Sequence, residues 1–229
     1  MYGKNNEKRR QDWVIKVLSS LPEGSSIIDV GAGECQYKKY CTHLAYTSQD
    51  FNQYKGQGNQ MGLQTGEWDI SQIDIVSDIT QIPIPDGKFD FVLCTEVLEH
   101  VPDPVLALNE MHRILKKGGR MIITAPFCSM THFAPFHFCD GFNKYFYKYH
   151  FDRLGHEILE LTPNGNYFEY ISQELIRLPI MLKKYNSKVH FLIKLLNIGI
   201  VKYLKFHDSP NHNSEDFLCF GYHCITLKK

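Results

Sequence analysis

The chain lacks net charge and has no long apolar segment. Its 25 Lys and Arg residues balance 25 Asp and Glu residues, so no overall field attracts it to nucleic acid or to an anionic surface. No uninterrupted apolar run reaches the roughly 18–20 residues of a transmembrane helix. The first ten residues, MYGKNNEKRR, have no apolar core like that of a signal peptide. We therefore expect a cytoplasmic protein with no transmembrane segment and no nucleic-acid partner.

Paired cysteines are also missing. The seven cysteines are an odd number and form no C-x-x-C pair, which favours reduced thiols. A chain of 229 residues can bury one substantial core. We predict a single domain over residues 1–229, with a core at about 25–126, an aromatic segment at about 127–151 and a helical insertion at about 167–208 before a final strand.

Short apolar runs alternate with helical patterns along most of the chain. Runs of this kind are typical of a parallel sheet with helices on both faces, which gives a Rossmann-like α/β fold. The spacing predicts strands at 26–30, 45–50, 73–78, 89–96, 120–126, 156–165 and 216–229. It predicts helices around 11–21, 34–44 and 104–117, and one or two helices over 167–206 that break at Pro179 and Asn186.

Three acids accompany the first three predicted strands: Asp29, Asp50 and Asp78. The carboxyl ends of parallel strands meet at one edge of the sheet, where ligands bind, so these carboxylates are expected to converge there. Gly31 and Gly33 follow the first strand and form the turn at that edge. The sequence therefore predicts a ligand site lined by acids.

The glycine turn discriminates among the ligands that such a site could hold. A nicotinamide dinucleotide requires G-x-G-x-x-G, but Gln36 stands at the third glycine position, and Asp29 would repel a pyrophosphate. A P-loop is excluded because no G-K-[ST] follows. S-adenosylmethionine carries a sulfonium, an ammonium and a ribose diol, and acids suit all three. Asp50 can accept both ribose hydroxyls.

Several ordered motifs resemble class I S-adenosylmethionine-dependent methyltransferases, in particular the group that includes ubiquinone and menaquinone methyltransferases. The motifs are IIDVGAGE, the acid of SQDF, VSDITQIPIPDGKFDFVLCTEVLEHVPDP and RILKKGGRMIITAP, and together they span about Ser25 to Pro126. The resemblance implies a seven-stranded sheet with an antiparallel last strand. It also implies S-adenosylmethionine as the cofactor.

The resemblance assigns roles to individual residues. Asp29, Gly31 and Gly33 match the turn that meets the methionine portion, and Asp50 matches the acid that binds the ribose. Phe51 matches the residue beside adenine, with Asp78 and Ile79 at the edge and face of that base. Thr95 and Glu96 match positions that line the methionine end. Cys35 stands where many members have a third glycine.

Histidines and aromatic residues dominate residues 127–151. His100, His132 and His137 are candidate general bases, although His100 and Glu99 could instead fix their loop by hydrogen bonds. The histidines follow no H-x-H or H-x-x-x-H spacing, so we expect no metal. In this segment aromatic rings can exclude water, and the polar ends of histidine, tyrosine and asparagine can orient polar groups of a substrate. We therefore interpret it as a wall or lid of the acceptor site and not as plain core packing.

The sequence thus predicts an enzyme that transfers a methyl group from S-adenosylmethionine to a small-molecule acceptor. A sugar, a lipid-linked intermediate or a secondary metabolite would fit. The alternatives are a non-catalytic S-adenosylmethionine-binding protein and, less favoured, an NAD-dependent oxidoreductase. Residues 176–206, apolar with interspersed lysines, could cap the acceptor pocket, form a dimer face or lie on a membrane surface. The protein is expected to be a monomer or a homodimer.

Overall fold

The computed structural model describes residues 2–185, 188, 191–208 and 213–229. The chain divides into two compact units. One unit comprises Asp12–Thr162 and Gly221–Lys229, and the other comprises the N-terminal residues up to Gln11 together with Pro163–Phe220. Each unit is described by itself below. The single-domain organisation stays a prediction.

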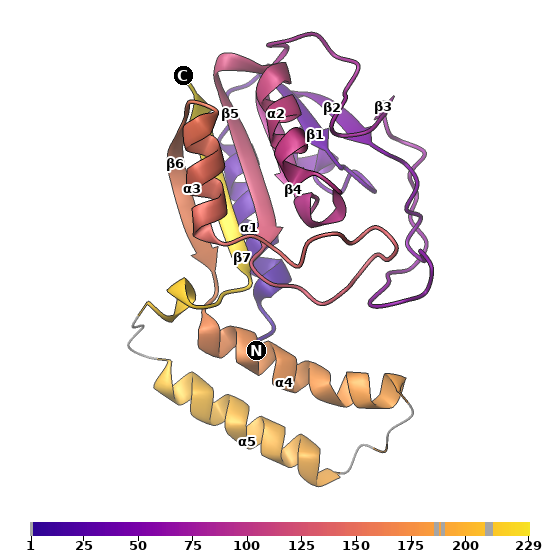
Figure 1. The fold of residues 1–229 in the computed structure, drawn as a ribbon, viewed down its shortest axis with the longest axis vertical. Helices are drawn as coiled ribbons and strands as arrows, with labels where there is room; N and C mark the ends of the chain where they lie inside the picture. Colours follow the sequence, from indigo (N-terminus) through magenta and orange to yellow (C-terminus); the bar gives the residue numbers. More distant parts are fainter. Residues whose placement is uncertain (1, 186–187, 189–190, 209–212) are drawn as a thin grey trace. The chain divides into compact units, whose positions relative to one another are not determined.

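Seven strands form one sheet in the order β3-β2-β1-β4-β5-β7-β6 (Figure 1). Adjacent strands from β3 to β5 pair in parallel, whereas β7 runs antiparallel to β5. This topology confirms the predicted Rossmann-like α/β class and its antiparallel last strand. The strands are β1 Ser26–Val30, β2 Ala45–Asp50, β3 Ile75–Val76, β4 Phe89–Thr95, β5 Leu115–Pro126, β6 His156–Asn164 and β7 Gly221–Lys228.

Successive side chains of a strand point to opposite faces of the sheet. In the central strands both sets of side chains are buried. On one face, Ile27 and Leu93 pack with Leu18 of α1 (Asn6–Ser19). The alternate residues Ile28 and Val92 are fully buried on the opposite face, which α2 (Pro104–Ile114) covers in Figure 1. This two-sided burial explains why the strands read as continuous apolar runs.

Several predicted elements differ from the structure, and three of the differences have a clear cause. The helix expected at 34–44 is a series of turns with one short 3₁₀ helix, Lys38–Tyr40, because Cys35 has a left-handed backbone with φ of 53°. Helix α2 ends at Ile114 instead of Lys117, since buried Leu115 already pairs with Phe89 in the sheet. The third strand keeps two residues, 75–76, of the six predicted.

Aromatic residues 127–151 form a long loop followed by α3 (Lys144–Arg153). Asn143 caps this helix by accepting hydrogen bonds from the backbone N–H groups of Tyr145 and Phe146. Tyr147 and Phe151, one turn apart, are fully buried. Helix α3 therefore contributes to the core, and the loop before it is available to line a binding site.

The second unit contains α4 (Tyr167–Lys184), α5 (Phe191–His207) and the short η3 (Ser214–Asp216). Arg9 binds Glu169 of α4 with two hydrogen bonds of 2.6 and 2.8 Å, and Asn197 of α5 donates to the Leu175 carbonyl. The predicted break at Pro179 is wrong, because this proline lies inside α4. The predicted break at Asn186 lies outside the described residues. Of the described helices, none combines the length and apolarity needed to cross a membrane.

Candidate functional site

A pocket opens at the carboxyl ends of β1, β2 and β4. Three carboxylates line it, and none of its described lining residues is a lysine or arginine. The remaining walls are apolar and largely aromatic. The lining residues are Gly31, Gln49, Asp50, Phe51, Tyr54, Trp68, Asp78, Ile79, Glu96, Val97, His100, Val101, Pro102, Phe133 and Phe136. A pocket of this composition favours a cationic ligand with an apolar body.

In the glycine turn after β1, the backbone N–H groups of residues 31–33 donate to acceptors within the protein. Gly31 and Ala32 both donate to the Gln49 carbonyl, at 2.8 and 3.0 Å, and Gly33 donates to the Asp50 carboxylate at 3.0 Å. A dinucleotide turn needs such groups for its pyrophosphate. A side chain at Gly31 would also meet Val97 at 2.5 Å. The turn therefore allows close approach of a ligand but offers no cradle for phosphate.

Asp50 ends β2 and projects into this pocket. Its two oxygens accept backbone N–H groups of Gly33 and Asn52, and Phe51 contributes a third backbone hydrogen bond. A carboxylate has about four acceptor positions, so one remains for a ligand hydroxyl. Burial raises the pKa of Asp50, and the backbone hydrogen bonds act in the opposite direction. The arrangement fits the role of ribose acceptor that the sequence indicates.

Asp29, Gly33 and Thr95 do not line the pocket. Asp29 is 2% exposed and accepts a hydrogen bond of 2.8 Å from the Tyr46 hydroxyl. Burial raises the pKa of Asp29 to about 7, with a smaller contribution from the nearby Asp50 charge. The predicted convergence therefore brings Asp50 and Asp78 to the pocket and leaves Asp29 behind them. Glu96 does reach the pocket, on a left-handed backbone with φ of 55°.

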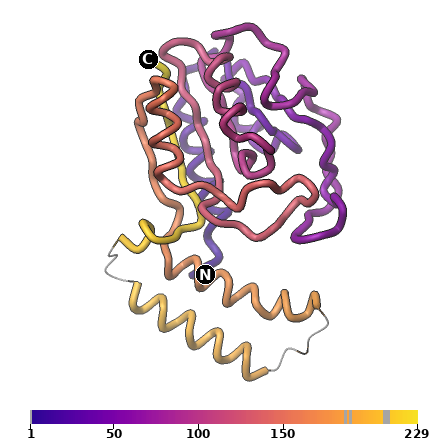
Figure 2. The backbone as a smooth tube through the Cα atoms, viewed as in Figure 1, coloured from indigo at the N-terminus to yellow at the C-terminus, as the bar shows by residue number. Residues whose placement is uncertain are grey.

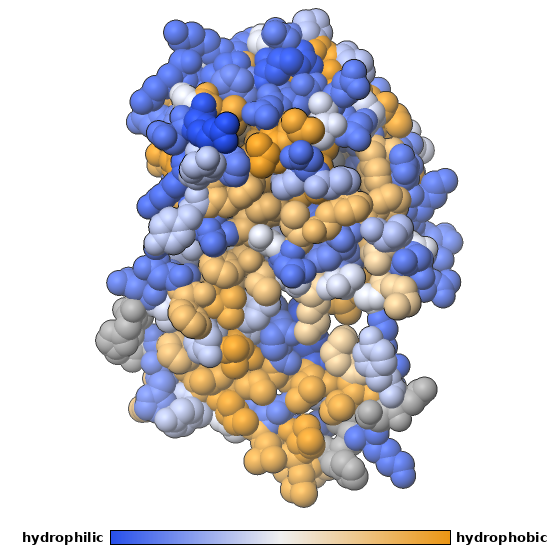
Figure 3. Space-filling view, in the orientation of Figure 1, coloured by the Kyte–Doolittle hydropathy of each residue, from blue (hydrophilic) through white to orange (hydrophobic). Residues whose placement is uncertain are grey.

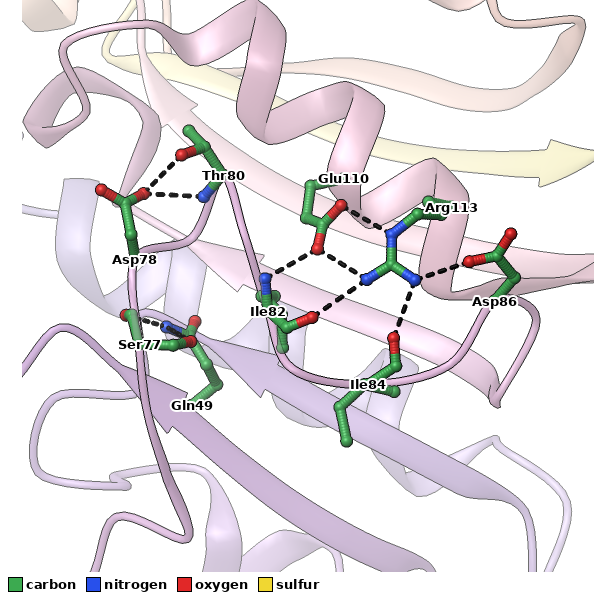
Figure 4. Close-up of polar contacts among 9 residues, drawn as sticks. All are labelled: Gln49, Ser77, Asp78, Thr80, Ile82, Ile84, Asp86, Glu110 and Arg113. Carbon is green, nitrogen blue, oxygen red and sulfur yellow. Dashed lines mark hydrogen bonds and ion pairs between the residues drawn. The ribbon is translucent and has the colours of Figure 1, made fainter.

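Asp78 and Ile79 lie on a segment held in place from both ends (Figure 4). At one end, Gln49 donates to the Ser77 carbonyl at 2.7 Å. At the other, Arg113 of α2 donates to the carbonyls of Ile82 and Ile84. Asp78 itself accepts from the backbone and hydroxyl of Thr80, so its carboxylate also closes a local turn. Sequence reasoning missed the anchoring by Arg113, because it joins parts of the chain about 30 residues apart.

Two loops distant in sequence form the aromatic wall of the pocket, and Figure 2 shows them side by side. The Phe133 N–H donates to the Leu63 carbonyl at 2.9 Å, and the Asn59 N–H donates to the Ala134 carbonyl at 2.9 Å. Phe133 stacks on Tyr54 with ring centroids 4.6 Å apart and meets Trp68 edge-on. The sequence indicated an aromatic wall after β5 but not that Tyr54 and Trp68 complete it.

The three candidate histidines gather at this wall. His100 lines the pocket, and its ring centroid lies 4.6 Å from that of His132 and 5.8 Å from that of His137. Burial and the neighbouring His132 lower the pKa of His100 to about 3. The imidazole is therefore neutral at pH 7 and holds a proton weakly, which weakens its case as a general base.

Comparisons with known proteins agree with this geometry. Residues 28–123 match the family model described as a methyltransferase domain. A demethylmenaquinone methyltransferase from Bacillus licheniformis is 26% identical over 119 residues, which are 50% of this chain and 51% of the relative. A ubiquinone biosynthesis O-methyltransferase from Alkalilimnicola ehrlichii is 29% identical over 121 residues, 50% of this chain and 47% of the relative. The matched region thus spans about half of each relative.

Solved structures show the same fold over nearly the whole chain. A [4+2]-cyclase superposes with a TM-score of 0.58 at 16% identity, covering 99% of this chain and 83% of its own. A Haemonchus contortus phosphoethanolamine N-methyltransferase in complex with S-adenosylhomocysteine superposes with a TM-score of 0.52 at 12% identity, covering 97% and 52%.

The sheet topology is that of these solved structures, and residues 28–123 match a methyltransferase domain, the kind of domain that uses S-adenosylmethionine. Residues 28–123 of the chain therefore resemble the methyltransferase domain family.

Proposed function

We propose that the protein transfers a methyl group from S-adenosylmethionine to a small-molecule acceptor that has an apolar surface. The observation that carries this proposal is the glycine turn, whose amides at residues 31–33 are bonded internally beside a pocket with three carboxylates. This chemistry favours a cation with a ribose diol and disfavours a dinucleotide. The NAD-dependent alternative is therefore the weaker one.

The bound cofactor supplies an electrophilic methyl group on a sulfonium. Asp50 holds the ribose, and Phe51 and Ile79 offer apolar surface to the adenine, with Asp78 at its edge. Glu96, close to the glycine turn, favours the positively charged methionine end. Positioning alone can supply on the order of 7–11 kcal/mol of the barrier to such a displacement. The chain's main tasks are then alignment and exclusion of water.

The aromatic wall supports an acceptor with an apolar or planar body. Tyr54, Trp68, Phe133 and Phe136 present ring surface to the pocket. The relatives named above for demethylmenaquinone and ubiquinone biosynthesis make a quinone-like or lipid-linked acceptor a reasonable first choice. A polar acceptor without apolar surface would leave these rings unused.

Binding and turnover test the proposal separately. Calorimetric titration with S-adenosylhomocysteine should show one saturable site, and NAD should not compete for it. Purified protein with labelled S-adenosylmethionine should then transfer label into a quinone-precursor or lipid extract. Binding without any transfer across such extracts would favour the non-catalytic alternative, and NAD binding would overturn the assignment.

We further propose that α4 and α5 rest on an anionic membrane surface. Residues 175–207 contain no Asp or Glu and seven basic residues. Apolar side chains on both helices are exposed, including Ile180, Leu192, Leu196 and Phe206 at 62–79%. Figure 3 shows this apolar surface. The basic residues of a second copy would repel those of the first. An anionic membrane, by contrast, attracts the basic residues and accommodates the exposed apolar side chains.

Vesicle sedimentation tests this partner. The protein should pellet with phosphatidylglycerol-rich vesicles, and Leu192→Gln with Leu196→Gln should reduce pelleting by removing two apolar anchors without changing the charge. Equal pelleting of wild type and variant would contradict the proposal, as would a stable dimer at the same concentration. A cytoplasmic protein at the inner membrane face is also consistent with seven cysteines that form no disulfide.

A further inference from the structure

His100, His132 and His137 form a compact imidazole cluster beside the pocket. One ring nitrogen from each lies within 4.8 Å of the others. The cluster joins the short helix after β4 (Leu98–His100) to the loop after β5, so no local sequence spacing reveals it. Its side chains are largely buried, with exposures of 13%, 20% and 5%. Three buried imidazoles at this distance need an explanation.

The outer hydrogen bonds orient two of the rings in the same way. Nδ1 of His100 lies 2.5 Å from the Phe136 carbonyl, and Nδ1 of His132 lies 2.9 Å from the Met130 carbonyl. A carbonyl can only accept, so both Nδ1 atoms carry the proton and both Nε2 atoms present a lone pair. Metal-binding histidines are typically fixed in this manner, with the second nitrogen donating to a backbone carbonyl.

A buried carboxylate lies beside two of these rings. Oε1 of Glu99, whose side chain is fully buried, lies 3.7 Å from Nε2 of His100 and 3.8 Å from Nε2 of His132. These distances are too long for hydrogen bonds. Ligands of one tetrahedral ion with bonds of about 2.0–2.1 Å lie roughly 3.3 Å apart, so a small contraction would suffice.

His137 completes the set. Among the described residues, both of its ring nitrogens are buried without a hydrogen-bond partner, and the carboxylate of exposed Asp140 is 3.6 Å away. A buried imidazole without partners is costly unless something binds it.

We propose that His100, His132, His137 and Glu99 bind one divalent transition-metal ion, with Zn²⁺ as the best match. Three imidazoles and one carboxylate are ligands that zinc accepts, whereas Mg²⁺ prefers oxygen donors. Because His100 also lines the pocket, the ion lies at the acceptor wall.

Direct metal binding tests the site without any need for turnover. The metal-free full chain, titrated with Zn²⁺ against a chromophoric chelator, should bind one ion per chain, and Co²⁺ should give the visible absorption of a tetrahedral site. Mg²⁺ should not compete. His132→Asn, the most exposed ligand, should weaken Zn²⁺ binding by more than the roughly 10–100-fold expected for loss of an outer partner. Glu99→Gln, close in shape, should weaken it as well.

His207→Gln is the matched control, because His207 is exposed on α5 outside the cluster. S-adenosylhomocysteine binding, measured on every variant, reports folding and the cofactor site independently of the ion. Zn²⁺ affinity that is equal in the wild type, His132→Asn and His207→Gln would overturn the proposal, as would absence of saturable binding. Zinc binding without S-adenosylhomocysteine binding would instead contradict the proposed function and leave the metal site standing.

Discussion

The two walls of the pocket are built in different ways. The strand wall, with Gly31, Asp50 and Glu96, extends directly from β1, β2 and β4, whose interiors are fully buried. The loop wall, with Tyr54, Trp68 and Phe133, depends on backbone contacts and ring stacking between residues 54–68 and 131–136. The strand wall is therefore positioned by the core of the sheet, whereas the loop wall is positioned by contacts between loops and with the short helix Leu98–His100.

This difference predicts a division of labour. Rigid strand ends suit a cofactor that every turnover uses, because its geometry need not change. Loops suit the acceptor, since loops vary and move more easily than the strands that carry them. Four experiments can sharpen or break this contrast.

The largest effect is expected at Asp29, beneath the strand wall. Its pKa is raised by burial to about 7, above the roughly 3.9 of an unfolded chain. The contribution of Asp29 to the free energy of unfolding is fully present below about pH 4 and is lost as the pH rises towards about 7. The loss amounts to about 4 kcal/mol at most. Asp29→Asn, which can still accept from Tyr46, should remove this loss.

Urea unfolding of the wild type and Asp29→Asn between pH 4 and pH 8 measures this effect. The stability of the wild type relative to the variant should fall over that interval and then level off. Parallel pH profiles would show that Asp29 is ionised in the folded chain. The strand wall would then be less dry than its burial indicates.

The second effect concerns the junction of the two loops. Gly58 has φ of 48°, and a Cβ there would lie 2.1 Å from the Ala134 carbonyl oxygen. Gly58→Ala should therefore separate the loops at a cost of about 1–3 kcal/mol. Amide exchange at Asn59, Leu63 and Phe133 should accelerate, while exchange in β1 and β4 should not change.

Gly66→Ala is the control, because a Cβ at Gly66 meets nothing within 4 Å. Faster exchange in the central strands of Gly58→Ala would mean that the two walls unfold together. The contrast between a core-positioned wall and a self-supporting one would then be wrong.

The same contrast explains what the sequence could predict. The seven-stranded topology and the pocket positions of Gly31, Asp50, Asp78 and Glu96 follow from strand periodicity, turn glycines and recognisable motifs. The contacts of Tyr54 and Trp68 with Phe133 could not be predicted from the sequence. They join segments about 65 to 80 residues apart, and the loops that carry them have no periodic sequence pattern. Asp29 shows a different limit, because alternation along β1 turned its side chain towards Tyr46 and away from the pocket.

The third effect tests the strand wall as the cofactor site. Asp50→Ala removes a charge-assisted acceptor for a ligand hydroxyl, a hydrogen bond worth on the order of 1.5–3 kcal/mol. S-adenosylhomocysteine should bind about 10–100-fold more weakly by calorimetry. Asp78→Ala, at an exposed residue of the same rim, should have a smaller effect. Equal affinities in wild type and Asp50→Ala would remove Asp50 from the site.

The smallest effect probes the loop wall with a change of shape alone. Phe133 stacks on Tyr54 and lies 5.0 Å from the His100 ring, and such ring pairs contribute about 0.5–1.5 kcal/mol beyond area. Phe133→Leu keeps apolar bulk but loses the stacking, so binding of an aromatic acceptor analogue should weaken about threefold to tenfold while S-adenosylhomocysteine affinity stays within twofold. Phe138→Leu, at an exposed ring in the same loop, should leave both unchanged. A larger loss of S-adenosylhomocysteine than of the analogue would show that the loop wall belongs to the cofactor, and the division between the two walls would fail.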